Sequence, residues 1–221
     1  MKIIKISVLI PSVNGIKLLF SCIQSIFGTS SGDNEIEVIV KLDFDDDETI
    51  QKINILPYKD KIKIIISHKG LGYGEIHTFI NDMAKLATGD WLQPLNDDTI
   101  MQTKNWDKYL EKFDSNKPLI IRHEPCAGRV GDTGDYYFPY ISRKYYETVG
   151  RITGCPSYDG YLLMIADELK IWDRVPVKIL HRELHEIKQV PEKNDNMIKS
   201  MSQRDRMYEK EIDKEKIRKI L

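Results

Sequence analysis

The chain has 221 residues, of which 41% are hydrophobic and 9% aromatic, so it can bury one substantial core and is most simply one domain with a tail. Its 33 basic and 34 acidic residues leave a formal net charge of -1, which argues against a nucleic-acid binder, because that class needs a basic face to neutralise phosphates. Three widely spaced cysteines indicate neither a disulfide framework nor a zinc site and favour a reducing, cytoplasmic compartment. We expect neither a signal peptide nor a membrane span, because the apolar runs are too short for either.

The first half of the chain alternates strand patterns with helix patterns. Apolar runs that predict buried strands occupy 3–10, 37–42, 62–67 and the residues from Gly89 to Leu95. Helices are predicted at 16–27, 49–56 and 75–87. Because strands and helices alternate with short connections, the predicted fold class is α/β, with a mostly parallel central sheet, right-handed crossovers and flanking helices.

The second half is less regular. Helices are predicted at 106–113, at 143–149 and from Asp159 to Leu169, and strands at 119–121 and 175–180. Aromatic residues crowd the span 136–146, and most of them are expected in the core, although such rings can also stack on sugars. The charged tail from Glu192 predicts a helix that is solvated and loosely attached, or docked on a partner, which would allow a homo-oligomer through the tail.

The predicted strand after Gly89 runs directly into polar residues, Asn96, Asp97 and Asp98. In an open α/β sheet, ligands bind where strands end at the carboxyl edge. Adjacent carboxylates repel each other unless a cation or hydrogen-bond donors offset the charge. The expected ligand is therefore Mn2+ or Mg2+ with a bound diphosphate. The alternative for these three residues alone is a turn before a helix, which favours Asn and Asp for local reasons.

Four pieces of the sequence carry a family resemblance. They are Ile-Ser-Val-Leu-Ile-Pro-Ser-Val-Asn at 6–14, Glu-Val-Ile-Val-Lys-Leu-Asp at 37–43, Asn81, and Gly-Asp-Trp-Leu-Gln-Pro-Leu-Asn-Asp-Asp at 89–98. Their order and spacing resemble the nucleotide-binding half of family 2 glycosyltransferases. The resemblance implies a single GT-A type, Rossmann-like domain, with a nucleotide-sugar-binding half at 1–100, an acceptor-side half at 101–191 and a charged helical tail at 192–221.

The resemblance also implies an activity and a set of site residues. The activity is metal-dependent transfer from a nucleotide-diphosphate sugar, a UDP-sugar foremost, to a glycan or other hydroxyl acceptor, with inversion at the anomeric carbon. Eight residues would bind the donor: Pro11, Ser12, Val13, Asn14, Asp43, Asn81, Asn96 and Asp97. Asp98 would bind Mn2+ or Mg2+, and His181 or His185 stands where some members add a metal ligand.

Three positions depart from the family pattern. Val13 stands where an aromatic residue often stacks on the base, and Lys41 precedes Asp43 where an acidic or apolar residue is common. Asn96 replaces the first acid of the usual Asp-x-Asp motif. These departures leave the base and the exact acid set open.

Asp159 falls where the family keeps its catalytic carboxylate. An acceptor hydroxyl must lose a proton as it attacks the sugar, so a carboxylate within hydrogen-bond reach serves as general base. The alternative is that Asp159 merely caps the helix it begins. In that case the base is sought among Glu124, Asp132 and Asp135.

Two other functions compete with a transferase. The segment Val-Lys-Leu-Asp-Phe-Asp at 40–45 resembles haloacid-dehalogenase-type phosphatases, in which the first Asp, here Asp43, is the nucleophile. Asp47 stands where that family has Thr or Val, which weighs against it. The second alternative is a non-catalytic nucleotide-binding module.

Overall fold

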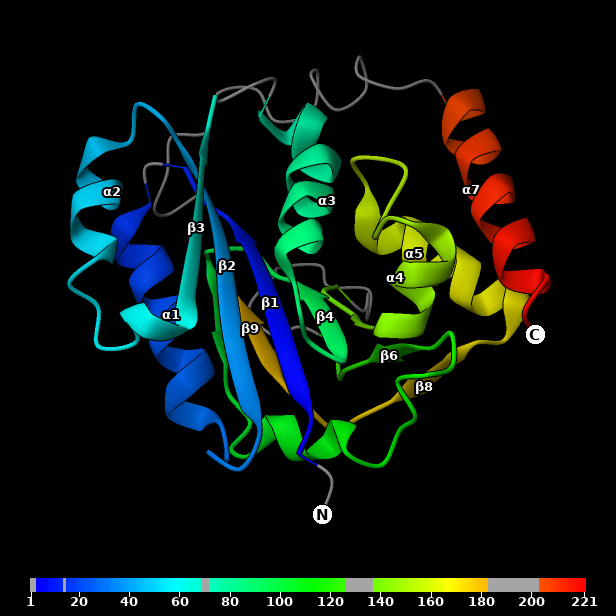
Figure 1. The fold of residues 1–221 in the computed structure, drawn as a ribbon, viewed down its shortest axis with the longest axis horizontal. Coiled ribbons are helices and arrows are strands. Elements are labelled where there is room, and N and C mark those ends of the chain that lie inside the picture. The colour runs from blue at the N-terminus through cyan, green and yellow to red at the C-terminus, as the bar shows by residue number, and fades with distance from the viewer. Residues whose placement is uncertain (1–2, 14, 69–71, 126–136, 183–202) are drawn as a thin grey trace.

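The computed structural model describes residues 3–13, 15–68, 72–125, 137–182 and 203–221. Its main sheet has seven strands in the order β3-β2-β1-β4-β7-β6-β8 (Figure 1). Their bounds are β1 Lys5–Pro11, β2 Glu35–Asp43, β3 Ile62–Ser67, β4 Trp91–Pro94, β6 Ile120–Arg122, β7 Tyr140–Ser142 and β8 Trp172–Arg174. A second sheet pairs β5 (Thr99–Met101) with β9 (Ile179–His181).

Strand direction places the site. β1, β2, β3 and β4 are mutually parallel, whereas β7 is antiparallel to both β4 and β6. It follows that β6 runs parallel to β4, and β8 is parallel to β6. The carboxyl ends of six of the seven strands therefore meet at one edge of the sheet.

Helices cover both faces of the sheet, as right-handed connections between parallel strands require. Their bounds are α1 Ile16–Thr29, α2 Asp47–Ile53, α3 Ile76–Leu86, α4 Arg143–Val149, α5 Tyr158–Leu169 and α7 Gln203–Arg218, with 3-10 turns at Lys59–Lys61, Gly72–Glu75 and Trp106–Leu110. The chain moves outward from β1 to β3 and then returns to β4 on the other side of β1, so right-handed crossovers place α1 and α3 on opposite faces (Figure 1). No described helix is long and apolar enough to cross a membrane.

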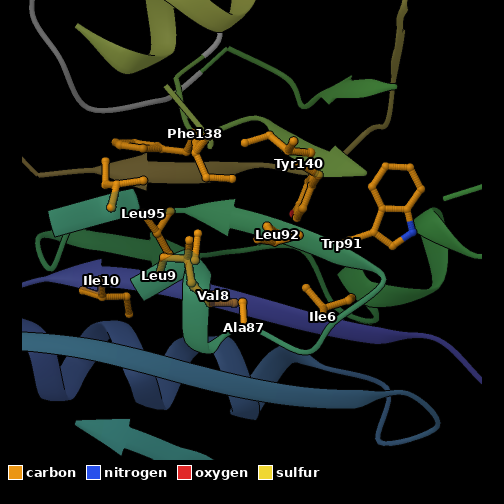
Figure 2. Packing of buried hydrophobic residues seen from close by; sticks show 14 of the residues in the cluster. Ile6, Val8, Leu9, Ile10, Ala87, Trp91, Leu92, Leu95, Phe138 and Tyr140 are labelled. Atoms are coloured by element: carbon orange, nitrogen blue, oxygen red, sulfur yellow. The ribbon is translucent and has the colours of Figure 1, made fainter. Parts of the chain in front are cut away.

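The central strands are buried on both faces, which explains their continuous apolar sequence. In β1, every residue from Ile6 to Ile10 is buried. Figure 2 shows side chains of β1 and β4 packed together with Phe138 and Tyr140. The aromatic span is therefore largely core, as expected: Phe138, Tyr140 and Tyr145 are all buried.

A buried carboxylate joins three strands at the amino end of the sheet. Glu37 of β2 accepts hydrogen bonds from Ser7 Oγ at 2.6 Å and from Thr88 N at 2.7 Å, and it pairs with Lys63 Nζ at 2.9 Å. Burial alone raises the pKa of Glu37, but the bonds from Ser7, Lys63 and Thr88 outweigh it and lower the pKa to about 2. Beside this group, a Cβ on Gly89 would lie 2.7 Å from Ser7 N, so only glycine fits.

The α/β class and the mostly parallel sheet are confirmed, and the first-half elements lie close to their predicted positions. Several second-half predictions are wrong. The segment from Trp106 is a short 3-10 turn, and the strand predicted at 175–180 shrinks to β9. The short strands β5, β7 and β8 were not predicted at all.

The charged C-terminal helix differs most from its prediction. α7 packs against α4 and α5 of its own chain (Figure 1). Ile217 and Asp213 of α7 are fully buried. The prediction of a solvated, loosely attached helix is therefore wrong. Its charges are paired with residues of the body: Arg151 binds Asp213, and Glu168 binds Lys210.

Candidate active site

The sheet has a topological switch point between β1 and β4. The chain leaves β1 toward β2 on one side and later returns to form β4 on the other side. Ser12 follows β1 and Asp97 follows β4, and Ser12 Oγ donates a 2.6 Å hydrogen bond to Asp97 Oδ2. Both residues are buried. The crevice at such a switch point is where open α/β sheets bind ligands.

A two-stranded ribbon brings Asp98 to His181. β5 begins directly after Asp98 and pairs antiparallel with β9, so that Thr99 lies opposite His181. The backbone of Arg182 also donates to the Asp98 carbonyl at 3.0 Å. As a result, His181 Nε2 lies 3.4 Å from Asp98 Oδ1.

Asp98 is the least satisfied acid of the site. Its side chain is 2% exposed, and neither carboxylate oxygen has a hydrogen-bond partner among the described residues. A buried carboxylate without donors is costly unless a cation neutralises it. The single imidazole beside it leaves much of that cost uncompensated.

Apolar and aromatic groups enclose this pair. The rings of Phe138 and Tyr137 lie 5.3 Å and 6.0 Å from the His181 ring, centroid to centroid. Phe138 adopts a left-handed backbone with φ of 59°, which is rare for a bulky residue and typical of functional sites. Cys22 Sγ lies 3.4 Å from Thr99 Oγ1, and burial together with the charges of Asp97 and Asp98 raises the pKa of Cys22 to about 12, so it stays a thiol.

The expected base-binding acid has a partner that the sequence analysis did not assign. Asp43, at the end of β2, is 1% exposed and forms an ion pair with Lys41 Nζ. The Lys41 ammonium also lies 4.0 Å from the centre of the Phe79 ring. Lys41 directly follows the apolar residues 38–40 of a predicted buried strand, and this was the available signal, because a buried lysine requires an acid nearby.

Three other donor-binding candidates lie near the carboxyl edge of the sheet. Pro11 ends β1, Val13 follows shortly after it, and Asn96 lies between β4 and Asp97. The donor-binding candidate Asn14, the possible metal ligand His185 and the alternative bases Asp132 and Asp135 lie outside the described residues.

Asn81 faces the loop before α5 instead of the strand ends. Its Oδ1 accepts from Ile152 N at 2.9 Å, and its Nδ2 donates to the Thr153 carbonyl at 2.8 Å. These bonds tie α3 to that loop.

Asp159 lies in the first turn of α5 and is partly exposed. α5 starts at Tyr158, one residue before the predicted start, and its N-cap residue is Ser157, so the alternative that Asp159 is the cap residue does not match the structure. The carboxylate Oδ1 accepts from Gly160 N at 2.8 Å.

The acid and imidazole fit a hard or borderline divalent ion. Asp98, a buried carboxylate that accepts no hydrogen bond from the described residues, and the neighbouring imidazole of His181 form a suitable partial ligand set for Mn2+ or Mg2+. Within the described ranges, no group of three or more His, Cys, Asp or Glu residues could hold a metal. Diphosphate oxygens and water would have to supply the remaining ligands.

The family model for glycosyl transferase family 2 matches residues 7–159, which include both strand ends of the switch point and Asp159. The chain belongs to glycosyl transferase family 2. Curated protein sequences gave no match to this family 2 chain.

Solved structures agree with the family fold. TarS 1-349 of S. aureus in complex with UDP superposes with a TM-score of 0.62 at 15% identity, over 79% of this chain and 60% of that chain. The mannosyltransferase PcManGT from Pyrobaculum calidifontis, in complex with GDP-Man and Mn2+, gives 0.60 at 13% identity, over 88% of this chain and 59% of that chain. These likenesses establish the GT-A fold, and the family 2 chain covers about 60% of each of these two solved chains.

Proposed function

We propose that this protein transfers a sugar from a nucleotide-diphosphate donor, a UDP-sugar foremost, to a hydroxyl acceptor with the help of Mn2+ or Mg2+. The observation that carries the proposal is the buried Asp98 carboxylate beside His181, which accepts no hydrogen bond from the described residues and lies next to the switch point of a family 2 fold. The relatives' complexes with UDP and with GDP-Man and Mn2+ support a nucleotide-sugar donor.

In the proposed donor site, each residue has a separate task. Asp98 and His181 would hold the ion, and the chemistry that a bound ion supplies is Lewis-acid stabilisation of the charge on the leaving diphosphate. Asn96 and Asp97 would lie near the ribose and the diphosphate, and Ser12 would fix the Asp97 carboxylate through its hydrogen bond. Asp43 would bind the base.

The acceptor half supplies the proton transfer. The acceptor hydroxyl attacks the anomeric carbon as the bond from that carbon to the diphosphate oxygen breaks on the opposite face, so the configuration inverts. Asp159 would accept the hydroxyl proton during the attack, a contribution that typically reaches about 100-fold or more in rate. Its place in the first turn of α5, on a partly exposed residue, supports this role.

The phosphatase alternative is disfavoured by the surroundings of Asp43. A nucleophilic carboxylate attacks phosphorus with its negative charge, and the charge of Asp43 is engaged by the ion pair with Lys41, which weakens it as a nucleophile. Release of phosphate from a simple phosphomonoester would overturn this argument.

The proposal is tested by thermal shift with UDP, GDP, UDP-glucose, UDP-GlcNAc and GDP-mannose, each with and without Mn2+. We expect a uridine nucleotide sugar to raise the melting temperature only with Mn2+, because a ligand that binds the folded state stabilises it by mass action. Asp98→Ala should abolish the Mn2+-dependent shift while the protein stays folded. Unchanged donor affinity of Asp98→Ala in Mn2+, measured by calorimetry, would refute the metal assignment.

The same screen separates an enzyme from a non-catalytic module. An enzyme should slowly hydrolyse the selected donor when Mn2+ is present, releasing free nucleotide that chromatography detects. Tight binding without any hydrolysis or transfer would favour the non-catalytic alternative.

A further inference from the structure

A buried carboxylate on α7 binds the segment that carries Asp159. Asp213 is fully buried, and Arg151 holds it with two hydrogen bonds, from Nε to Oδ2 at 3.0 Å and from Nη2 to Oδ1 at 2.9 Å. The Tyr161 hydroxyl donates to the same carboxylate. Arg151 Nη2 also reaches Glu209 Oε2 at 2.6 Å. We call these four residues the Asp213 cluster.

The cluster binds the 151–161 segment at both ends. Arg151 begins the loop that leads to α5, and Tyr161 lies in the first turns of α5, two residues after Asp159. Burial and the hydrogen bond to Asp213 raise the pKa of Tyr161, so its hydroxyl keeps the proton that it donates. Neither end of this segment can shift without breaking a bond to the Asp213 carboxylate.

A third contact joins the middle of the segment to the nucleotide-binding half. The amides of Ile152 and Thr153 donate to Asn81 Oδ1 on α3, at 2.9 Å and 3.3 Å. α3 packs on β1 and β2, the strands that end at the proposed donor site. The segment is therefore held between α7 on one side and the donor half on the other.

α7 also packs directly against the loop before α5. A Cβ built on Gly154 would lie 3.0 Å from Cβ of Glu209. α7 accordingly reaches the loop that leads directly to Asp159.

A buried charge cluster is a poor device for stability alone. Desolvation of Asp213 offsets most of the attraction to Arg151, and apolar residues of similar volume often stabilise such a contact equally well. Directional, bidentate hydrogen bonds instead fix the position of the two side chains relative to each other. We propose that the Asp213 cluster is a positioning device through which α7 sets the geometry of Asp159 toward the acceptor hydroxyl.

In this device Asp213, Arg151 and Tyr161 are positioning residues, and none of them is assigned to contact the substrate. The inference rests on the proposed function of Asp159. It predicts that damage to the cluster lowers turnover and leaves donor binding intact, because the donor contacts lie on β1, β2, β4 and the β5–β9 ribbon.

The chain offers a matched control on the same pair of helices. Glu168, in the last turn of α5, binds Lys210 Nζ at 2.8 Å and also binds Lys214. Because Glu168 lies at the opposite end of α5 from Asp159, its loss loosens the contact between α5 and α7 without releasing the 151–161 segment. Glu168→Gln therefore measures the effect of weaker docking alone.

The experiment compares Asp213→Asn with Glu168→Gln in the full-length protein. The first measurement is hydrogen exchange of the Ile152 and Thr153 amides, which needs no substrate. We expect Asp213→Asn to speed their exchange by about 10-fold or more, through local opening of the segment, and Glu168→Gln to leave it unchanged. Equal exchange in wild type and Asp213→Asn would overturn the proposal.

The second measurement is kinetic and uses the nucleotide sugar selected by the thermal-shift screen. Asp213→Asn should lower kcat by roughly 10- to 100-fold with KM for the donor unchanged, the scale of a misplaced catalytic group, while Glu168→Gln keeps kcat. An equal loss of kcat in both variants would show a merely structural role and overturn the proposal. Tyr161→Phe, which removes only one hydroxyl, replaces Asp213→Asn if that variant does not fold.

The two measurements keep this inference separate from the proposed function. If wild type turns over no nucleotide sugar, the proposed function fails, and the exchange rates still report whether the cluster holds the segment. If wild type is active and Asp213→Asn exchanges faster but keeps full kcat, the proposed function stands and the positioning role is wrong.

Discussion

Replacing Asp98 with asparagine should stabilise the metal-free protein and abolish its response to Mn2+. In the wild type, the Asp98 carboxylate is 2% exposed, and its two oxygens accept no hydrogen bond among the described residues. Leaving such a buried polar group unsatisfied costs about 1 to 3 kcal/mol, and more when the group is charged. Asparagine keeps the shape, removes the charge and can donate from its amide to His181 Nε2.

The expected shift follows from that cost. For a chain of this length, 1 kcal/mol changes the melting temperature by about 2 to 4 °C, so Asp98→Asn should melt roughly 2 to 12 °C above the metal-free wild type. With Mn2+ and donor at about 100 times the dissociation constant, the wild type gains about 2.7 kcal/mol, and the variant gains nothing. The difference between the two proteins should therefore shrink or reverse when Mn2+ and donor are added.

Differential scanning calorimetry on both proteins, with and without Mn2+ and donor, measures all four melting temperatures. Asp45→Asn is the matched control, because Asp45 is an exposed acid beyond the end of β2 and its loss should change neither value appreciably. The reasoning is refuted if metal-free Asp98→Asn melts below the wild type, or if it keeps the Mn2+-dependent gain. Either result would mean that the carboxylate is satisfied within the fold and does not serve an ion.

Three further predictions concern catalysis, acid stability and packing. Asp159→Asn should cut transfer by about 100-fold or more while donor affinity and melting temperature hold, because the amide oxygen can still accept from Gly160 N; turnover and melting are measured on one preparation. Glu37→Gln should lose about 3 kcal/mol of unfolding free energy at pH 7 in urea titrations, since the pKa of Glu37 falls from 4.5 to about 2 on folding. Gly89→Ala should destabilise by about 1 to 3 kcal/mol, because its Cβ would lie 2.7 Å from Ser7 N.

Each of these predictions has an opposing result. If Asp159→Asn melts early yet keeps its activity per folded molecule, the residue is structural and the base must be sought elsewhere. The depressed pKa of Glu37 stabilises the fold above about pH 4.5 and loses that effect as the pH falls toward 2. The gap between wild type and Glu37→Gln must therefore close in acid, and a constant gap would contradict the pKa assignment. A Gly89→Ala protein as stable as wild type would show that β4 can shift away from β1.

The first half of the fold could be predicted because its signals are local. Buried parallel strands require continuous apolar runs and amphipathic helices require a 3.6-residue period, and both patterns are present from β1 to β4. The same patterns carry the family motifs, so the family and the GT-A fold were predicted correctly. Strands of three residues, such as β5, β7 and β8, are too short to show a period, and their partners in the sheet decide them.

The sequence by itself determined the order of strands and helices from β1 to β4, the family, and the acids that follow β4. It could not determine which side chains meet. The approach of His181 to Asp98, the pairing of Lys41 with Asp43 and the burial of Asp213 against Arg151 all join residues through tertiary contacts. A charged residue looks the same in sequence whether water or a buried partner neutralises it. Only the tertiary structure brings the partner within hydrogen-bond distance, and so it decided both the site and the docking of α7.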